Sequence, residues 1–109
     1  DEVRASILGR WPDGHFFSYG HLGDGNLHLV ACVGSDEPEA RADVSRRVYE
    51  PLAALGGSIS AEHGIGRQKK AYLAISRSAT EIALMQRLKR SLDPHGLLNP
   101  GLIFDSDPV

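Results

Sequence analysis

The sequence predicts an α+β fold, and three patterns support this prediction. Residues 15–33 alternate loosely between apolar and polar side chains, whereas residues 37–55 and 78–92 repeat apolar side chains every three or four positions. Strands and helices thus mix without strict alternation, which favours an antiparallel sheet with helices packed on one face. The 109 residues amount to about one ordinary domain, so we expect residues 1–109 to form a single domain.

The first predicted element is a β-hairpin within residues 15–33. Its centre is Asp24-Gly25, a dipeptide that favours the two-residue type I′ turn. With that turn, His21 would stand directly opposite His28 in the ladder.

A long helix is predicted to follow over residues 37–55. Asp36 can cap its N-terminus, and Pro51 removes one backbone donor, so we expect a kink or loosening before Gly56-Gly57 ends the helix. The apolar stripe consists of Ala40, Val44, Val48, Leu52 and Leu55.

The second half of the chain predicts shorter elements around one further clear helix. Residues 57–61 predict a strand, 62–66 a glycine-rich loop, and 69–75 a short helix. Ser78 and Glu81 have the spacing of a capping box that begins the next helix.

That helix should end at Asp93-Pro94, because proline disfavours helical backbone at the residue before it. Asn99-Pro100-Gly101 is the strongest turn signal of the tail that follows.

Composition excludes several function classes. The net charge is -2, and the only basic run lies between Arg67 and Lys70, so we expect neither nucleic acid nor an anionic membrane as a partner. A lone cysteine, Cys32, excludes an internal disulfide and favours the cytoplasm. No signal peptide or transmembrane segment is visible. The start at Asp1 without methionine suggests a piece of a longer chain.

The stretch HLGDGNLH is the strongest candidate for chemistry. Directly opposed residues of a hairpin have Cβ atoms about 4.5–5.5 Å apart, so His21 and His28 could bind one ion. Glu62, at the end of the predicted strand, is the best-placed third ligand. Two imidazoles and one carboxylate leave coordination positions open and suit zinc, manganese or iron. We expect the adjacent His63 to point elsewhere and to serve as a general base.

The spacing alone leaves two functions open. In a metal-dependent hydrolase or metal-binding module, His63 or Glu62 would instead serve a metal-bound water. In a non-catalytic interaction domain, the hairpin and the helices would be purely structural.

Three segments, GHLGDGNLH, SAEHGIGRQKKAYL and LDPHGLLNPG, resemble the C-terminal region of FAD-linked oxidases. These flavoenzymes, of the vanillyl-alcohol oxidase type, include D-lactate, glycolate and D-2-hydroxyglutarate dehydrogenases. The segments occur in the family's order over residues 20–101, about three quarters of the chain.

The resemblance implies an FAD-dependent oxidation of a D-2-hydroxy acid to the 2-oxo acid, with hydride transfer to the flavin. By resemblance, His21, His28 and Glu62 bind a divalent metal, His63 is the catalytic base, and Asn99 approaches the flavin. The implied partners are a small 2-hydroxy acid, an electron acceptor, and an N-terminal FAD-binding domain that residues 1–109 do not contain.

We therefore expect this portion of a larger cap or substrate domain to be inactive alone. The parent protein would be cytoplasmic, peripheral to a membrane, or organellar. Two positions depart from the family pattern: Leu102 stands where lysine is common after NPG, and Val30 stands where D-2-hydroxyglutarate-type members carry asparagine.

Overall fold

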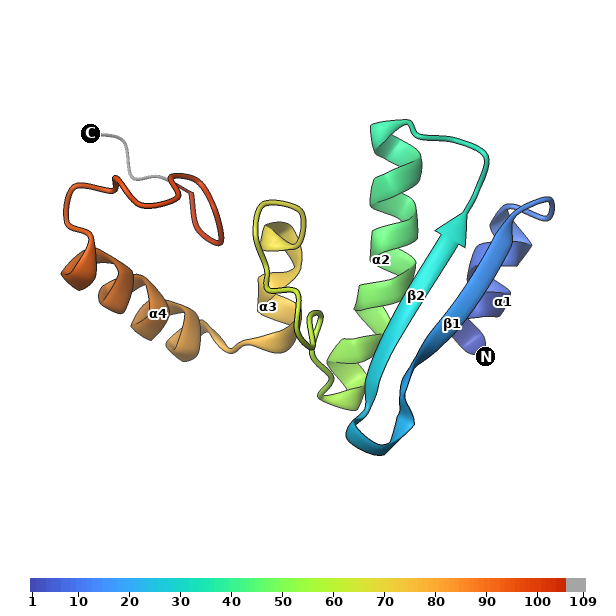
Figure 1. Cartoon of the computed structure of the whole chain (residues 1–109), viewed down its shortest axis with the longest axis horizontal. Helices are drawn as coiled ribbons and strands as arrows, with labels where there is room; N and C mark the ends of the chain where they lie inside the picture. The colour runs from blue at the N-terminus through green and yellow to red at the C-terminus, as the bar shows by residue number, and fades with distance from the viewer. Residues whose placement is uncertain (106–109) are drawn as a thin grey trace. The chain divides into compact units, whose positions relative to one another are not determined.

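The computed structural model describes residues 1–105 and divides into two compact units, Asp1–Pro51 and a second unit that begins at Leu52. Together they contain four α-helices and one two-stranded antiparallel sheet (Figure 1). This confirms the predicted α+β class. Over residues 1–105, no helix combines the length and the apolar character that crossing a bilayer requires.

The first unit is a β-hairpin with helices before and after it. Helix α1 (Glu2–Arg10) contacts strand β1 (His15–His21), which pairs with strand β2 (Asn26–Cys32). Helix α2 (Pro38–Leu55) follows, and the unit boundary falls within it, directly after Pro51. Ile7 of α1 is fully buried in this unit.

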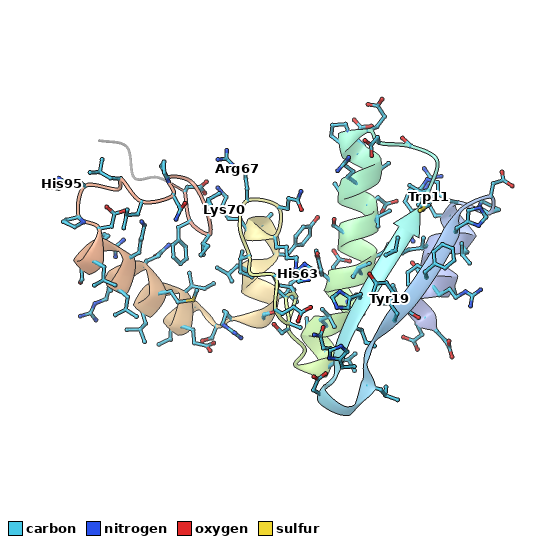
Figure 2. All side chains as sticks on the ribbon, viewed as in Figure 1. Trp11, Tyr19, His63, Arg67, Lys70 and His95 are labelled. Carbon is cyan, nitrogen blue, oxygen red and sulfur yellow. The ribbon has the colours of Figure 1, made fainter. Side chains whose placement is uncertain are left out.

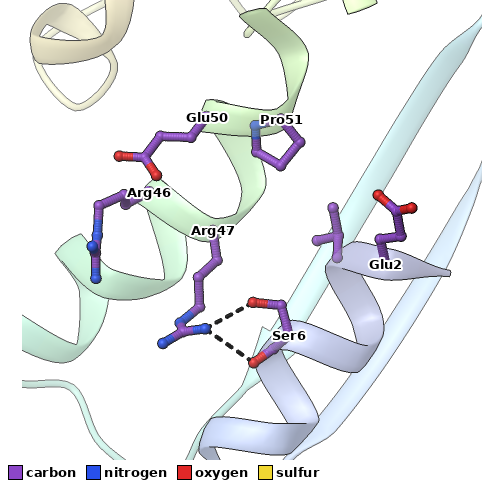
Figure 3. A pocket seen from close by; sticks show the side chains of 7 residues that line it. Glu2, Ser6, Arg46, Arg47, Glu50 and Pro51 are labelled. Atoms are coloured by element: carbon purple, nitrogen blue, oxygen red, sulfur yellow. Dashed lines mark hydrogen bonds between the residues drawn. The ribbon is translucent and has the colours of Figure 1, made fainter. Parts of the chain in front are cut away.

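Arg47 of α2 forms hydrogen bonds with α1. The Arg47 guanidinium donates to the carbonyl oxygen of Ser6 at 3.2 Å and to its hydroxyl at 2.7 Å. These two hydrogen bonds lie in a pocket of about 290 Å³ (Figure 3). The other residues that line it are Glu2, Val3, Arg46, Glu50 and Pro51, so the pocket contains none of the predicted site residues.

The hairpin register differs from the prediction by two residues. His21 pairs with Asn26, and His28 pairs with Tyr19, so His21 and His28 are not directly opposed. The loop has four residues instead of two, because Leu22–Asp24 form a 3-10 turn and only Gly25 adopts the left-handed conformation, at φ 71°. A type I′ turn would need positive φ at Asp24 as well.

Helix α2 matches the predicted span, and a serine turn precedes it. The Ser35 hydroxyl, not the Asp36 carboxylate, accepts the backbone N–H of Glu37, and Asp36 instead forms an ion pair with Arg41. The helix continues without a break through Pro51. It ends as predicted, because Gly56 takes φ 62° and the N–H of Gly57 turns back to the carbonyl of Leu52.

Helix α1 was not predicted. Its sequence buries a single side chain, Ile7, so it lacks the apolar periodicity that predicts a helix. The sequence offers only a weak signal for this helix, in the charges at its two ends. Glu2 lies in the first turn and Arg10 in the last, where each interacts favourably with the helix dipole.

The second unit contains no strand over its described residues 52–105, so the strand predicted at 57–61 is wrong. Its backbone finds side-chain partners in place of a ladder: the Ser76 hydroxyl accepts the N–H of Ile59 and donates to the carbonyl of Gly57. The buried side chains of Ile59 and Leu73 supply the apolar core.

The remaining predicted elements of this unit are confirmed. A 3-10 turn (Lys70–Tyr72) leads into the short helix α3 (Leu73–Ser76), within the predicted 69–75 region apart from its last residue. Helix α4 (Ala79–Leu92) begins with the predicted capping box of Ser78 and Glu81 and ends before Asp93. The hydrogen bond from the Ser78 backbone to Glu81 lowers the pKa of that carboxyl group.

Candidate functional site

The hairpin presents His21 and His28 on the same face. Directly paired residues share a face, and every second residue of a strand returns to it. Because His28 pairs with Tyr19, and His21 lies two residues beyond Tyr19, the two histidines are diagonal neighbours. Diagonal positions are about 7–8 Å apart, within the reach of two imidazoles that bind one ion. Because the observed register differs from the predicted one by two residues, an even number, the two histidines still share one face.

Glycine is required at the position next to His21. Gly20 has φ +148°, and a Cβ built there would lie 2.1 Å from the backbone oxygen of Asn26. The close approach of β1 to β2 at the end of the ladder therefore depends on the absence of a side chain.

A tyrosine, Tyr19, holds the ring of His28. The two rings stack with centroids 5.0 Å apart and planes 14° apart (Figure 2 labels Tyr19). Such stacking restricts the rotation of the imidazole. The spacing along the chain does not indicate this contact, which follows from the cross-strand register.

The same face also carries Phe17 and Val30, which pair with each other. Phe17 is 58% exposed and Val30 is 39% exposed. The position at which the family pattern differs thus lies on the histidine face, two residues from His28, and presents an apolar surface beside the imidazoles.

In the second unit, one loop carries Glu62 and His63. The Oε1 atom of Glu62 lies 3.3 Å from Nε2 of His63, and their side chains are 51% and 67% exposed (Figure 2 labels His63). The expectation that His63 points away from Glu62 is therefore wrong. A carboxylate beside an imidazole can orient the ring.

The Asn99 loop is fixed at both ends. At its start, the Asp93 carboxylate accepts the backbone N–H groups of Leu97 and Leu98, each at 2.9 Å, and a hydrogen bond from the Lys89 ammonium group. The Lys89 hydrogen bond is the main reason that the pKa of Asp93 falls to about 2, and the backbone N–H groups lower it further.

The far end of this loop returns to the Gly66 region. The N–H of Ile103 donates to the carbonyl of Gly66 at 3.1 Å, and the Lys70 ammonium donates to the carbonyl of Gly101 at 3.3 Å (Figure 2 labels Lys70). Asn99 itself has φ 49°, and its carbonyl accepts the N–H of Leu102, which confirms the predicted turn. The sequence predicts the turn but not the hydrogen bonds that hold this end of the loop.

The imidazole and carboxylate side chains described above are of the types that bind divalent transition metals. Within the first unit, the hairpin places two imidazoles on one face; within the second unit, one loop places a carboxylate beside an imidazole. Nitrogen and carboxylate donors without a thiolate fit zinc, manganese or iron. The donor atoms of these side chains are thus of the types that such a metal binds.

Comparison with known proteins identifies the relationship. Residues 9–103 match the family model "FAD linked oxidases, C-terminal domain". The chain is 46% identical over 110 residues to the D-2-hydroxyglutarate dehydrogenase of Xanthomonas citri pv. viticola, covering 96% of this chain and 23% of that protein. It is 43% identical over 108 residues to the same-named protein of Stutzerimonas stutzeri, covering 94% and 23%.

A mitochondrial relative is similar over a shorter range. The D-2-hydroxyglutarate dehydrogenase of Rattus norvegicus is 46% identical over 86 residues, which cover 79% of this chain and 16% of that protein. The chain thus spans less than a quarter of the length of these relatives. On the evidence of its ordered motifs and of a family match over nearly its whole length, the chain belongs to the FAD-linked oxidase C-terminal domain family.

Proposed function

We propose that this chain is the substrate- and metal-binding portion of an FAD-dependent oxidoreductase that oxidises a D-2-hydroxy acid to the 2-oxo acid. Family membership over residues 9–103 supports this, as do relatives named D-2-hydroxyglutarate dehydrogenase. FAD would be held mainly by a separate domain, with Asn99 approaching it from this chain, and an electron acceptor would reoxidise it. Family membership disfavours the hydrolase and interaction-domain alternatives.

The observation that carries the site proposal is the common face of His21 and His28. We propose that these two histidines and Glu62 bind a divalent metal, with coordination positions left for the carboxylate and the 2-hydroxyl group of the substrate. A metal bound there would supply a Lewis acid that lowers the pKa of that hydroxyl group, and bound FAD would supply the hydride acceptor.

His63 is the proposed catalytic base. As the substrate is oxidised, the hydroxyl proton moves to an imidazole nitrogen of His63, and the α-hydrogen leaves with its electron pair as a hydride. The Glu62 carboxylate lies 3.3 Å from His63 and can orient its imidazole ring. The carbon that loses the hydride becomes the carbonyl carbon of the 2-oxo acid, and bound FAD would accept the hydride.

Val30 bears on the choice among 2-hydroxy acids. It lies on the histidine face, where an apolar side chain cannot offer a hydrogen bond to a second carboxylate. The substrates to compare are therefore D-2-hydroxyglutarate, after which the relatives are named, and D-lactate, which has a methyl group in place of the longer acidic chain.

The compartment is proposed at a coarse level. A relative named as mitochondrial supports an organelle, and the lone Cys32 is compatible with any reducing compartment, including the cytoplasm. Fractionation of cells that express the full-length protein would separate these locations.

The test uses the full-length protein with bound flavin. Anaerobic addition of D-2-hydroxyglutarate or D-lactate should bleach the oxidised flavin absorbance, with the L-enantiomer as a control. His63→Ala should keep flavin and metal but lose flavin reduction, whereas His28→Ala should lose metal. His95→Ala, an exposed histidine outside the proposed site, should behave as wild type. A full-length protein without flavin would refute the function, and rapid reduction in the His63 variant would refute the base.

A further inference from the structure

We propose that Ser60 and Lys69 are positioning residues that clamp the loop carrying Glu62 and His63. This inference rests on the proposed function, because it concerns the same metal ligand and the same base. The Ser60 hydroxyl donates to the carbonyl oxygen of Gly64 at 2.8 Å, and the Lys69 ammonium donates to that hydroxyl oxygen at 3.0 Å.

The direction of these hydrogen bonds follows from the groups involved. An ammonium group can only donate, so the Ser60 oxygen must be the acceptor from Lys69. The single hydroxyl hydrogen is then available for the carbonyl oxygen of Gly64, which can only accept. Lys69 therefore fixes the orientation in which Ser60 closes the loop, and a positive charge strengthens the chain of hydrogen bonds.

The clamp encloses a very short segment. Only three residues, 61–63, lie between Ser60 and Gly64, and two of them are the proposed ligand and base. The chain before the clamp is also fixed, because Ile59 is 4% exposed and its N–H donates to the Ser76 hydroxyl at 2.8 Å. The Ser58 hydroxyl adds a hydrogen bond to the carbonyl of Ser60 at 2.9 Å.

Lys69 differs from the other two cations of its segment. Its backbone N–H donates to the carbonyl of Ile65, which places it in the turn that directly follows the loop, and its side chain is partly buried. Lys70 contacts the carbonyl of Gly101 instead, and Arg67 is exposed (Figure 2). Three neighbouring cations that look alike in sequence thus have different surroundings, and only Lys69 contacts the loop of Glu62 and His63.

The clamp has a chemical consequence because the ligand and the base are themselves exposed. Glu62 and His63 keep 51% and 67% of their side chains accessible, so the backbone of the loop contributes to their placement. Side chains that orient metal ligands are worth about 10- to 100-fold in metal affinity or activity. We expect the clamp to act within this range.

The experiment measures Zn²⁺ binding by metal-free, flavin-loaded full-length protein, with a competing chelating dye. Ser60→Ala and Lys69→Met should each weaken binding about 10-fold or more, while flavin absorbance is unchanged. The double variant should bind Zn²⁺ no more weakly than the single variant with the larger loss of affinity, since both changes open one clamp. Ser60→Thr keeps the hydroxyl and should restore affinity, and Arg67→Met is the matched control that should have no effect.

A second measurement separates positioning from general stability. Hydrogen–deuterium exchange should rise in a peptide that covers residues 60–64 in both clamp variants, and should stay unchanged over α4. Wild-type Zn²⁺ affinity in the Ser60→Ala variant, with affinity lost in His28→Ala, would overturn the clamp and leave the metal site standing. Wild-type affinity in His28→Ala as well would overturn the metal site together with the clamp.

Discussion

Three glycines of one segment, Gly20, Gly23 and Gly25, test the hairpin geometry when each is replaced by alanine. At Gly20 the new Cβ would lie 2.1 Å from the oxygen of Asn26, whereas real contacts of this kind stay beyond 3.0 Å. The strands must therefore separate by about 0.9 Å, and overpacking with backbone strain at φ +148° together cost about 2–5 kcal/mol.

The other two glycines provide graded controls. Gly25 has φ +71° with open space around its Cβ position, so alanine there costs only the left-handed conformation, about 1–2 kcal/mol. Gly23 has open space and no positive φ, so alanine should change stability by less than about 0.5 kcal/mol.

Hydrogen–deuterium exchange over residues 15–32 of the full-length protein measures the local opening of the hairpin. A loss of 2 kcal/mol corresponds to an opening population about 30-fold larger. The expected order of exchange is Gly20→Ala fastest, then Gly25→Ala, then Gly23→Ala equal to wild type. Equal effects at Gly20 and Gly23, or a neutral Gly20→Ala, would refute the register and the close approach of the strands.

Three further changes test other parts of the chain. Ser78→Ala removes the capping box and should cost about 1 kcal/mol, measured as faster amide exchange in the first turn of α4. The pKa of the Asp93 carboxyl group is lowered, so its contribution to stability is full above the unfolded pKa of 3.8 and is lost as the pH falls through about 2. Amide exchange over residues 93–99 should rise as the pH falls through this range, and Asp93→Asn should remove this pH dependence. Val30→Asn should raise kcat/KM for D-2-hydroxyglutarate relative to D-lactate in the full-length protein; an unchanged ratio would exclude Val30 from substrate selection.

The sequence predicted best those elements that carry their own signals. The α4 helix has a capping box, an apolar stripe and a stop at Asp93, and all three lie within fifteen or so residues of one another. The end of α2 at Gly56 is equally local, because the left-handed turn needs only the glycine itself.

The errors arose where the outcome depends on distant partners. A strand at residues 57–61 would have needed a neighbouring strand, but the hydroxyl of Ser76 satisfies that backbone instead, and the sequence does not show this contact. Helix α1 buries only Ile7, so its position depends on the strand that it contacts more than on its own pattern.

The candidate site was predictable in its residue types but not in its supporting contacts. His21 and His28 were recognised from their spacing, and they share a face even though the loop is longer than predicted. The sequence does not predict the roles of Tyr19, Ser60 and Lys69, because these roles follow from register and loop closure, which spacing along the chain does not specify.

The four-residue hairpin loop limits how this segment can change in evolution. Side chains alternate between faces with a period of two, so a one-residue insertion or deletion that shifts the register would turn His28 away from His21. A change of two residues would preserve the shared face and alter only the spacing between the imidazoles. Changes between Leu22 and Gly25 that shift the strand pairing by two residues should therefore be tolerated, and those that shift it by one should be selected against.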